Sequence, residues 1–331
     1  MKVIGILTSG GDAPGMNAAV RAITRVANKL GMDVFGIYHG FAGLIEDEII
    51  RLDSRKVGDV LHRGGTFLKT ARSPEFMTEE GQAKAVANIK KYGMQGLAVI
   101  GGDGSFKGAL ALQRHGVKVV GIPGTIDNDI PCTDYTIGFD TAINTVVDCV
   151  NKIRDTATSH ERTFVVEVMG KNCGDLALHA GLAGGAEVIL IPEVEPDYDA
   201  VCKKVQKSHH QAKSHAVVIV AEGVGGDPAY RKDYLSAAFH VAELINKRTG
   251  IETRVTILGH IQRGGSPTAS DRLLASRLGA EAARALYEED TGKMIAIQDG
   301  KVVRVDLEYA LSQKKTVKRE YLELANMLSS V

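Results

Sequence analysis

Short runs of consecutive apolar residues recur along the chain, and a glycine-rich turn follows most of them. Runs of about five β-branched or aliphatic residues with little alternation are typical of strands that are buried on both faces of a sheet. We therefore predict strands at residues 3–7, 96–100, 117–122, 163–168, 188–191, 216–221 and 254–258.

Between these runs, apolar residues recur with the period of an α-helix. The clearest stripe covers residues 16–30, and residues 78–91 open on Thr-Glu-Glu, as helices commonly do. Further helices are predicted at residues 140–153, 230–244, 270–287 and 316–328, and a hairpin at residues 297–303. Strands that alternate with helices in this way predict an α/β fold, in which helices cover both faces of mainly parallel sheets.

The composition limits the class of protein and its partners. The chain has 331 residues, enough for about two domains, although no linker-like composition marks a boundary. Lys and Arg number 40, as do Asp and Glu, so no overall field favours nucleic acid or an anionic membrane. No apolar run approaches the ~18 residues of a membrane-spanning helix. The first residues indicate a strand and not a signal peptide. We therefore expect neither nucleic acid nor a membrane as a partner.

The cysteines are far apart in the sequence and form no CxxC motif; they are Cys132, Cys149, Cys173 and Cys202. Their spacing fits neither a disulfide framework nor a zinc site. We expect reduced thiols, which are typical of a cytoplasmic protein.

Two glycine-rich turns, residues 9–17 and 101–105, each follow a predicted strand and open a helix. Glycine lets backbone N–H groups approach an anion, and a helix N-terminus adds partial positive charge, so both turns suit a phosphate group. Asp103 adds a carboxylate to the second turn, which suits a polyphosphate that carries magnesium. Neither turn is a Walker A loop. A tight strand-to-helix connection, with Asp103 as a helix N-cap, is the structural alternative.

Asp127 and Asp129 come shortly after the predicted strand at residues 117–122. Residues two apart on an extended segment project to the same side. Crowded carboxylates are costly unless they hold a metal ion, a proton or a sugar hydroxyl. The alternative is that they only build a turn, which Pro131 supports.

Several cationic residues lie near glycine-rich segments, namely Arg72, Arg162, Lys171, Arg254, His260 and Arg263. His260 and Arg263 are bracketed by glycines, and an arginine with a nearby histidine suits a sugar phosphate. A second group lies outside the turns and consists of Arg21, Arg25, Lys213 and His215. Arg21 and Arg25 are one helical turn apart. A solvated face is the alternative for this second group.

These segments form an ordered set of motifs along essentially the whole chain. In order, they read TSGGDAPGMNA, HRGGT, IGGDGS, PGTIDNDI, IGFDTA, RDTATSHER, VEVMG, AEG and LGHIQRGGSP. The set closely resembles the ATP-dependent 6-phosphofructokinases of the bacterial type. The resemblance implies transfer of the γ-phosphoryl group of MgATP to the 1-hydroxyl of fructose 6-phosphate, the committed step of glycolysis. It also implies a cytoplasmic, allosterically regulated homotetramer.

The resemblance further implies roles for individual residues. ATP would be bound by Gly11, Arg72, Ser73, Gly102, Asp103, Gly104 and Ser105, with Asp103 on the magnesium ion. The catalytic residues would be Asp127, as the base for the sugar hydroxyl, and Lys171. The sugar phosphate would contact Thr125, Asp127, Asp129, Arg162, Met169, Gly170, Lys171, Glu222, Arg254, His260 and Arg263. Of these, Arg162 and Arg254 would come from a neighbouring subunit. ADP or phosphoenolpyruvate would act as an effector at Arg21, Arg25, Arg154, Gly185, Glu187, Lys213 and His215.

The fold that the resemblance implies has two Rossmann-like, three-layer lobes, and the chain crosses between them more than once. An ATP-binding lobe would comprise residues 1–138 and about 262–312. A sugar-phosphate-binding lobe would comprise residues 139–261 and about 313–331. Repeated crossing would explain why the sequence shows no single linker.

The chain departs from the usual pattern of the family at several positions. Lys171 stands where arginine is usual, which keeps the charge but loses the bidentate fork. Gln211 and Ser54 stand where basic residues of the effector site are common, so we expect an altered effector response. The segment around residues 227–245 is longer than is usual in the family.

The nature of the phosphoryl donor depends on two glycines. Pyrophosphate-using relatives typically carry Asp at the position of Gly104 and Lys at that of Gly124, so small residues here favour ATP. One alternative is a related kinase with another donor or another sugar phosphate. A second is a catalytically silent, nucleotide-sensing subunit, which the presence of Asp103, Asp127 and Arg162 disfavours.

Overall fold

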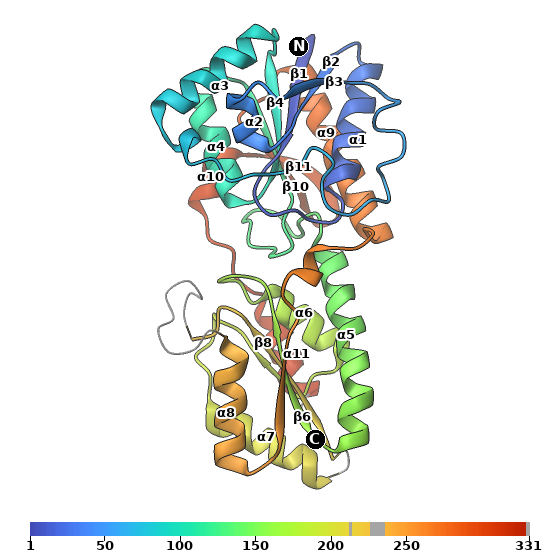
Figure 1. Cartoon of the computed structure of the whole chain (residues 1–331), viewed down its shortest axis with the longest axis vertical. Helices are drawn as coiled ribbons and strands as arrows, with labels where there is room; N and C mark the ends of the chain where they lie inside the picture. Colours follow the sequence, from blue (N-terminus) through green and yellow to red (C-terminus); the bar gives the residue numbers. More distant parts are fainter. Residues whose placement is uncertain (212–213, 226–235, 329–331) are drawn as a thin grey trace. The chain divides into compact units, whose positions relative to one another are not determined.

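The computed structural model describes residues 1–211, 214–225 and 236–328, which form two compact units (Figure 1). The first unit consists of Met1–Ile126, Ile130–Thr141 and Arg263–Lys315. The second consists of the described parts of Asp127–Asp129, Ala142–Gln262 and Thr316–Val331. No helix in the described ranges has the length and apolar character needed to cross a membrane.

A seven-stranded sheet forms the middle layer of the first unit, in the order β11-β10-β5-β4-β1-β2-β3. Its inner strands are parallel, and the two edge strands pair antiparallel. The strands are β1 (Val3–Thr8), β2 (Asp33–Ile37), β3 (Ile49–Leu52), β4 (Gly96–Gly101), β5 (Val119–Pro123), β10 (Lys293–Gln298) and β11 (Lys301–Asp306).

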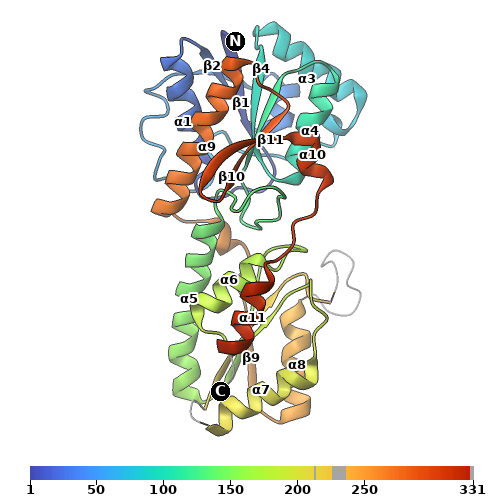
Figure 2. The same ribbon diagram turned by 180° about the vertical axis from the view of Figure 1, so that it is seen from behind.

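Helices cover both faces of this sheet (Figures 1 and 2). One face carries α1 (Met16–Lys29) and α9 (Ala269–Glu288). The other face carries α2 (Gly40–Ile45), α3 (Glu79–Lys91), α4 (Asp103–Arg114) and α10 (Leu307–Ser312). The N-terminus of α3 is capped as the sequence predicts, because the Thr78 hydroxyl accepts a hydrogen bond from the Gly81 N–H at 3.1 Å.

A four-stranded parallel sheet, in the order β7-β8-β6-β9, forms the middle layer of the second unit. Its strands are β6 (Thr163–Val168), β7 (Val188–Leu190), β8 (Ala216–Ala221) and β9 (Thr253–Ile257). One face carries α7 (Tyr198–Gln211) and α8 (Ala237–Thr249). The other carries α5 (Phe139–His160), α6 (Asp175–Gly184) and α11 (Arg319–Leu328), as Figure 2 shows.

The α/β fold class, with mainly parallel sheets in two three-layer units, is therefore confirmed. Each predicted strand is present, but the sequence analysis did not identify β2 and β3. Of the strands that were predicted to be buried on both faces, β9 departs clearly from this pattern: it is an edge strand, and Ile257 at its end is 46% exposed. The predicted helix at residues 230–244 coincides with α8 from residue 237 onward, and residues 226–235 lie outside the described residues. All four cysteines are free thiols, as expected.

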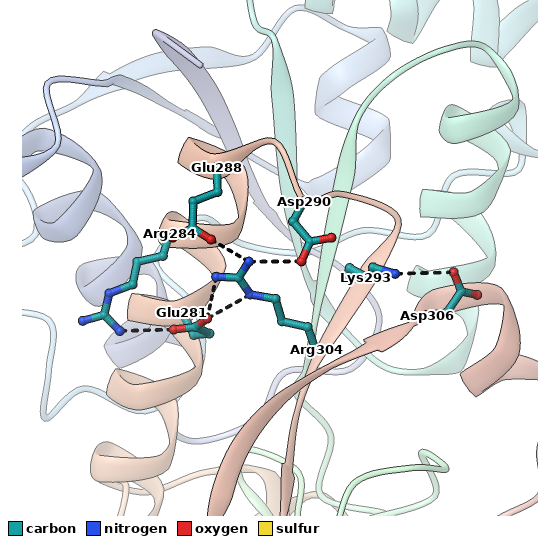
Figure 3. Close-up of polar contacts among 7 residues, drawn as sticks. All are labelled: Glu281, Arg284, Glu288, Asp290, Lys293, Arg304 and Asp306. Carbon is teal, nitrogen blue, oxygen red and sulfur yellow. Dashed lines mark hydrogen bonds and ion pairs between the residues drawn. The ribbon is translucent and has the colours of Figure 1, made fainter.

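The predicted hairpin joins β10 to β11 and forms one edge of the first sheet. Asp299 and Gly300 connect the strands with φ angles of 48° and 73°, which suit a two-residue hairpin turn. The guanidinium of Arg304 on β11 pairs with Glu281 of α9 at 2.6 Å, and with Glu288 and Asp290 at 2.8 and 3.0 Å (Figure 3). This network fixes an edge strand to a neighbouring helix, and so it protects that edge from pairing with another chain.

Strand register brings distant turns together within each unit. In the first sheet, Thr8 of β1 pairs with Ile100 of β4, so the glycine turns that follow these strands are neighbours. In the second sheet, Val168 of β6 pairs with Ala221 of β8, which places the residues after each strand at one edge. Ligands of open α/β sheets bind outside the carboxyl ends of the strands, and both groups of predicted site residues lie there.

Candidate functional site

The two glycine turns of the first unit are in direct contact. The Ser9 N–H donates to the Ile100 carbonyl at 2.9 Å, and a Cβ on Gly101 would lie 2.5 Å from the Ser9 carbonyl oxygen. A side chain at residue 101 would therefore separate the turns. The glycine is required for this close backbone approach.

Arg263 lies against the first glycine turn. A Cβ on Gly11 would lie 2.1 Å from its Nη1 atom, and the same nitrogen donates to the Asp12 carbonyl oxygen at 3.3 Å. Residues 11 and 263 are far apart in the sequence, yet the fold of the first unit brings them together. The result is a guanidinium beside the first glycine turn, and a guanidinium attracts an anion.

The second glycine turn forms the N-terminus of α4. Gly102 occupies the N-cap position and Asp103 is the first helical residue, so N–H groups at this end have no partner inside the helix. Gly104 has nothing within 4 Å of the place where a Cβ would stand. The hydroxyl of Ser105 is buried and has no hydrogen-bond partner among the described residues. The turn therefore presents donors and open space, as a phosphate site does.

Arg72, Ser73 and Thr125 also belong to the first unit. Arg72 is exposed, and the Ser73 hydroxyl accepts a hydrogen bond from the Phe76 N–H at 3.3 Å. Thr125 is buried just after β5, and its carbonyl accepts the hydroxyl of Thr136 at 2.6 Å. Local hydrogen bonds thus define the places of Ser73 and Thr125, whereas Arg72 lies exposed at the surface.

A magnesium ion fits the chemistry of the second turn when it arrives with polyphosphate. Among the described residues, no group of three or more His, Cys, Asp or Glu side chains could hold a metal ion without other ligands. Kinases, however, hold Mg²⁺ through one or two carboxylates together with substrate phosphates and water. The Asp103 carboxylate, beside backbone donors for the phosphates, matches that pattern.

The second unit contributes a carboxylate cluster, which we define as Asp127, Asp129, Lys171 and Glu222. Asp127 is fully buried, and the Lys171 Nζ lies 2.9 Å from its Oδ2 and 3.9 Å from Oδ2 of Asp129. Asn128 adopts a left-handed conformation, with a φ of 50°, and its side chain donates to Asp175 at 2.7 Å. One ammonium thus faces both carboxylates that the sequence analysis identified. The charge of Lys171 offsets part of the cost of burying Asp127.

Glu222, after β8, holds the segment after β6 in place. Its Oε1 accepts hydrogen bonds from the N–H groups of Lys171 at 2.8 Å and Gly170 at 3.2 Å. Burial raises the pKa of the Glu222 carboxyl above its ordinary value, the Lys171 N–H opposes this shift, and the charge of Asp127 adds to it. Gly170 has a φ of 134°, which only glycine adopts without strain. This bend comes directly before Lys171, whose ammonium contacts Asp127.

Gln262 and Asp175 support the cluster, and the sequence analysis missed both. Gln262 is fully buried; its Oε1 accepts the Met169 N–H at 3.2 Å, and its Nε2 donates to the Gly259 carbonyl at 2.9 Å. It lies within the motif LGHIQRGGSP, which could have drawn attention to it. His260 of the same motif is exposed. Asp175 carried no signal in the sequence, because its partner Asn128 is 47 residues away.

Arg162 and Arg254 lie together but away from the carboxylate cluster. Both pair with Glu252, and Phe164 of β6 is in register with Arg254 of β9. Arg162 precedes β6 whereas Met169 follows it, and six residues of strand span about 20 Å. Within one chain, therefore, these arginines do not reach the cluster.

The predicted effector residues of the second unit form a small group. Arg154 donates to the carbonyls of Gly184 at 2.6 Å and Gly185 at 2.9 Å, and lies 3.8 Å from Glu187. The other carboxylate oxygen of Glu187 accepts the Val217 N–H at 2.7 Å, close in sequence to the buried His215. The structure thus brings Arg154, Gly185 and Glu187 into contact.

The remaining predicted effector residues that the structure describes do not belong to this group in the second unit. Arg21 and Arg25 lie on α1 of the first unit, where burial and then the charge of Arg25 lower the pKa of Arg21. The Nε of Arg21 is buried and has no hydrogen-bond partner within the described ranges. Lys213 lies outside the described residues.

Comparison with known proteins points to one family. The family profile described as phosphofructokinase matches residues 3–286. The ATP-dependent 6-phosphofructokinase of Halothermothrix orenii is 55% identical over 331 residues, which covers 99% of this chain and 100% of that protein. The enzyme of the same name from Bacillus subtilis is 55% identical over 329 residues, with the same coverage.

Solved structures agree in fold. The phosphofructokinase of Saccharomyces cerevisiae matches 99% of this chain, with a TM-score of 0.88 and 36% identity. This chain spans 47% of that yeast chain, or about half of its length. A pyrophosphate-dependent phosphofructokinase of Marinobacter aquaeolei matches 98% of this chain and 91% of its own, with a TM-score of 0.84. At 20% identity, this last match concerns the fold alone.

Proposed function

The chain belongs to the phosphofructokinase family, and from this premise we propose that it is an ATP-dependent 6-phosphofructokinase. It transfers the γ-phosphoryl group of ATP to the 1-hydroxyl of fructose 6-phosphate, and it yields fructose 1,6-bisphosphate and ADP in glycolysis. The single observation that carries the proposal is the buried Asp127 carboxylate, which lies 2.9 Å from the ammonium of Lys171. The glycine turns of the first unit supply the matching phosphate site.

ATP binds at the turns of the first unit. Its ligands are Gly11, Arg72, Ser73, Gly102, Asp103, Gly104 and Ser105. Backbone N–H groups and the buried Ser105 hydroxyl meet the phosphate oxygens, and Arg72 adds a cation. Mg²⁺ at Asp103 supplies further charge neutralisation when it is bound. Phosphoryl transfer depends mainly on such positioning and neutralisation, because little covalent chemistry falls to the protein.

The carboxylate cluster carries the acid–base chemistry. The Asp127 carboxylate accepts the proton of the sugar 1-hydroxyl as its oxygen bonds to the γ-phosphorus, and the bond to the β-phosphate oxygen breaks. Lys171 balances the charge of Asp127. Glu222 keeps Lys171 in position through its backbone N–H.

The sugar phosphate has further ligands besides the carboxylate cluster. The ligands that we propose for it include Thr125, Asp129, Met169, Gly170, Glu222, His260 and Arg263. Arg162 and Arg254 serve the site of a neighbouring subunit in a homotetramer, which agrees with their distance from the cluster of their own chain. In this scheme the first unit is the ATP-binding lobe and the second the sugar-phosphate-binding lobe, in a cytoplasmic enzyme.

The enzyme is regulated at a second anion site. ADP or phosphoenolpyruvate binds to Arg21, Arg25, Arg154, Gly185, Glu187, Lys213 and His215. The polar group of Arg154, Gly185 and Glu187 supports this proposal for the second unit.

Pyrophosphate is the second candidate donor, and two observations disfavour it. The place of a Cβ on Gly104 is open, which leaves room for a nucleotide. A Cβ on Gly124 would lie 3.2 Å from side-chain atoms of both Ile100 and Met16, so a lysine would be crowded there. Neither position therefore carries the charged side chain that typifies pyrophosphate users.

A coupled assay for fructose 1,6-bisphosphate tests the proposed function. The purified chain should form this product from fructose 6-phosphate when Mg²⁺ and ATP are both present, and faster with ATP than with pyrophosphate as the donor. A folded chain that makes no product in the complete mixture would refute the proposal. Faster turnover with pyrophosphate would show that pyrophosphate, and not ATP, is the phosphoryl donor.

A further inference from the structure

Lys107 carries an ion pair that the roles proposed so far do not use. Its Nζ lies 2.7 Å from Oδ2 of Asp103, one turn earlier on α4, and the side chains are 68% and 46% exposed. Exposed pairs of this spacing contribute little to stability. Lys152 and Asp148 on α5 form a pair with the same spacing and similar exposure, but no glycine turn adjoins them.

The surroundings of the Asp103–Lys107 pair favour an anion. The first N–H groups of α4 have no partner inside the helix, and the helix dipole adds positive charge there. The Ser105 hydroxyl is buried, with no hydrogen-bond partner in the part of the chain that the structure describes. The Cβ position of Gly104 is open. A ligand at this turn would therefore lie beside the ammonium of Lys107.

The carboxylate of Asp103 places a negative charge at the turn where the polyphosphate would bind. A polyphosphate that approaches without a metal ion would meet a negative group, and like charges in contact repel strongly. The ammonium of Lys107 is the cation that already touches this carboxylate. Because lysine has a long, flexible stem, it can change partners while the backbone stays in place.

We propose that Lys107 is a phosphate-binding residue of the nucleotide site: it neutralises Asp103 when no divalent ion is bound and pairs with the polyphosphate when one is. The inference rests on the proposed function, since it assigns the phosphates of ATP to this turn. It adds a cation that the family resemblance did not supply.

Calorimetry with a non-hydrolysable ATP analogue, AMP-PNP, tests this role without turnover. The full chain is titrated in EDTA and in excess Mg²⁺, without fructose 6-phosphate. Lys107→Gln should weaken binding about tenfold in EDTA, because the Asp103 carboxylate then stays unneutralised beside the polyphosphate, a repulsion comparable to the worth of one charge-assisted contact. In Mg²⁺ the loss should be smaller, because the ion then offsets the charge of Asp103 and only the contact of Lys107 with the polyphosphate is lost. Lys107→Arg should restore the affinity, and the matched control Lys152→Gln should leave it unchanged.

Other outcomes would overturn the inference. Equal or tighter binding by Lys107→Gln in EDTA, an equal loss in both buffers, or the same loss in Lys152→Gln would each do so. Melting temperatures check that the variants fold, and Lys107→Met is the second variant to use if the glutamine variant does not. Failure of the proposed function would be visible in the wild type instead, as no binding of AMP-PNP in either buffer or no fructose 1,6-bisphosphate in the assay.

Discussion

The glycine turns of the first unit and the carboxylate cluster of the second are built from different parts of the chain. The turns depend on backbone groups and on glycines, which have no side chain, as at Gly11, Gly101 and Gly104. The cluster depends on charged side chains that hydrogen bonds hold in place, chiefly Asp127, Lys171 and Glu222. In the turns, substitutions should act by adding atoms or charge. In the cluster, they should act by removing a functional group.

The largest effect is expected from removing the proposed base. Asp127→Asn should lower kcat about 10²- to 10⁴-fold, because general base catalysis is worth that much. The KM for ATP should change little. Steady-state kinetics measures both values, and Asp148→Asn is a matched control, since Asp148 is an exposed carboxylate that also pairs with a lysine. An unchanged kcat would show that the proton goes elsewhere.

Adding a charge to the glycine turns should have the next largest effect. Gly104→Asp fits sterically, because nothing lies within 4 Å of the Cβ position. Its carboxylate should raise the KM for ATP about tenfold to a hundredfold, since like charges in contact cost several kcal/mol. The KM for fructose 6-phosphate and the melting temperature should stay close to those of the wild type.

Gly104→Ala is the control for this substitution. It adds the Cβ without the charge, so the KM for ATP should stay within about threefold of the wild-type value, as for an ordinary surface change. If alanine and aspartate raised the KM equally, space and not charge would govern this position.

A smaller effect is expected at Lys171, where the resemblance leads us to expect an arginine. Lys171→Met removes the cation 2.9 Å from Asp127 and should lower kcat about tenfold, the loss for one charge-assisted contact. Lys171→Arg keeps the charge and should retain most of the activity. The φ of Lys171 is 52°, and neither substitution adds backbone strain that lysine does not already have. Comparing kcat for the two variants shows whether the charge or the shape of the side chain matters. Equal losses of kcat in both variants would show that the positive charge of Lys171 has no role.

The smallest effect concerns Glu222 and the pH dependence of stability. Its pKa in the folded chain is raised, mainly by burial, above the ordinary value of 4.5. The folded state therefore binds the proton more tightly than the unfolded state. It follows that the free energy of unfolding decreases as the pH rises from about 4.5 through the raised pKa. Glu222→Gln keeps an oxygen acceptor but cannot titrate, so this part of the decrease should vanish when melting temperatures are compared across pH. Parallel curves for the two proteins would contradict the assignment.

Much of the fold could be predicted from local patterns. Buried parallel strands such as β4 and β8 appear as uninterrupted apolar runs, and the turn at Asp299 and Gly300 has a recognisable pair of residues. Strand β2 was missed because Asp33 and Gly36 interrupt its apolar run. Strand β9 contains Arg254 and two threonines, and its place at the sheet edge leaves it partly exposed, which depends on strand order.

The candidate site could be predicted less completely. Asp103 and Asp127 lie in recognisable segments, but the contact of Asp127 with Lys171 joins residues 44 positions apart. The support from Gln262 depends on how β6 and the segment after β9 pack. Such partners follow from tertiary structure, and neither spacing nor residue type reveals them.

A crystal structure with AMP-PNP, Mg²⁺ and fructose 6-phosphate would show whether both reactants bind at the proposed site. We expect the phosphates to lie on the turn of residues 101–105. We also expect the sugar 1-hydroxyl to lie within about 3 Å of the Asp127 carboxylate, as a general base requires. Reactants bound away from Asp103 and Asp127 would contradict the proposed mechanism.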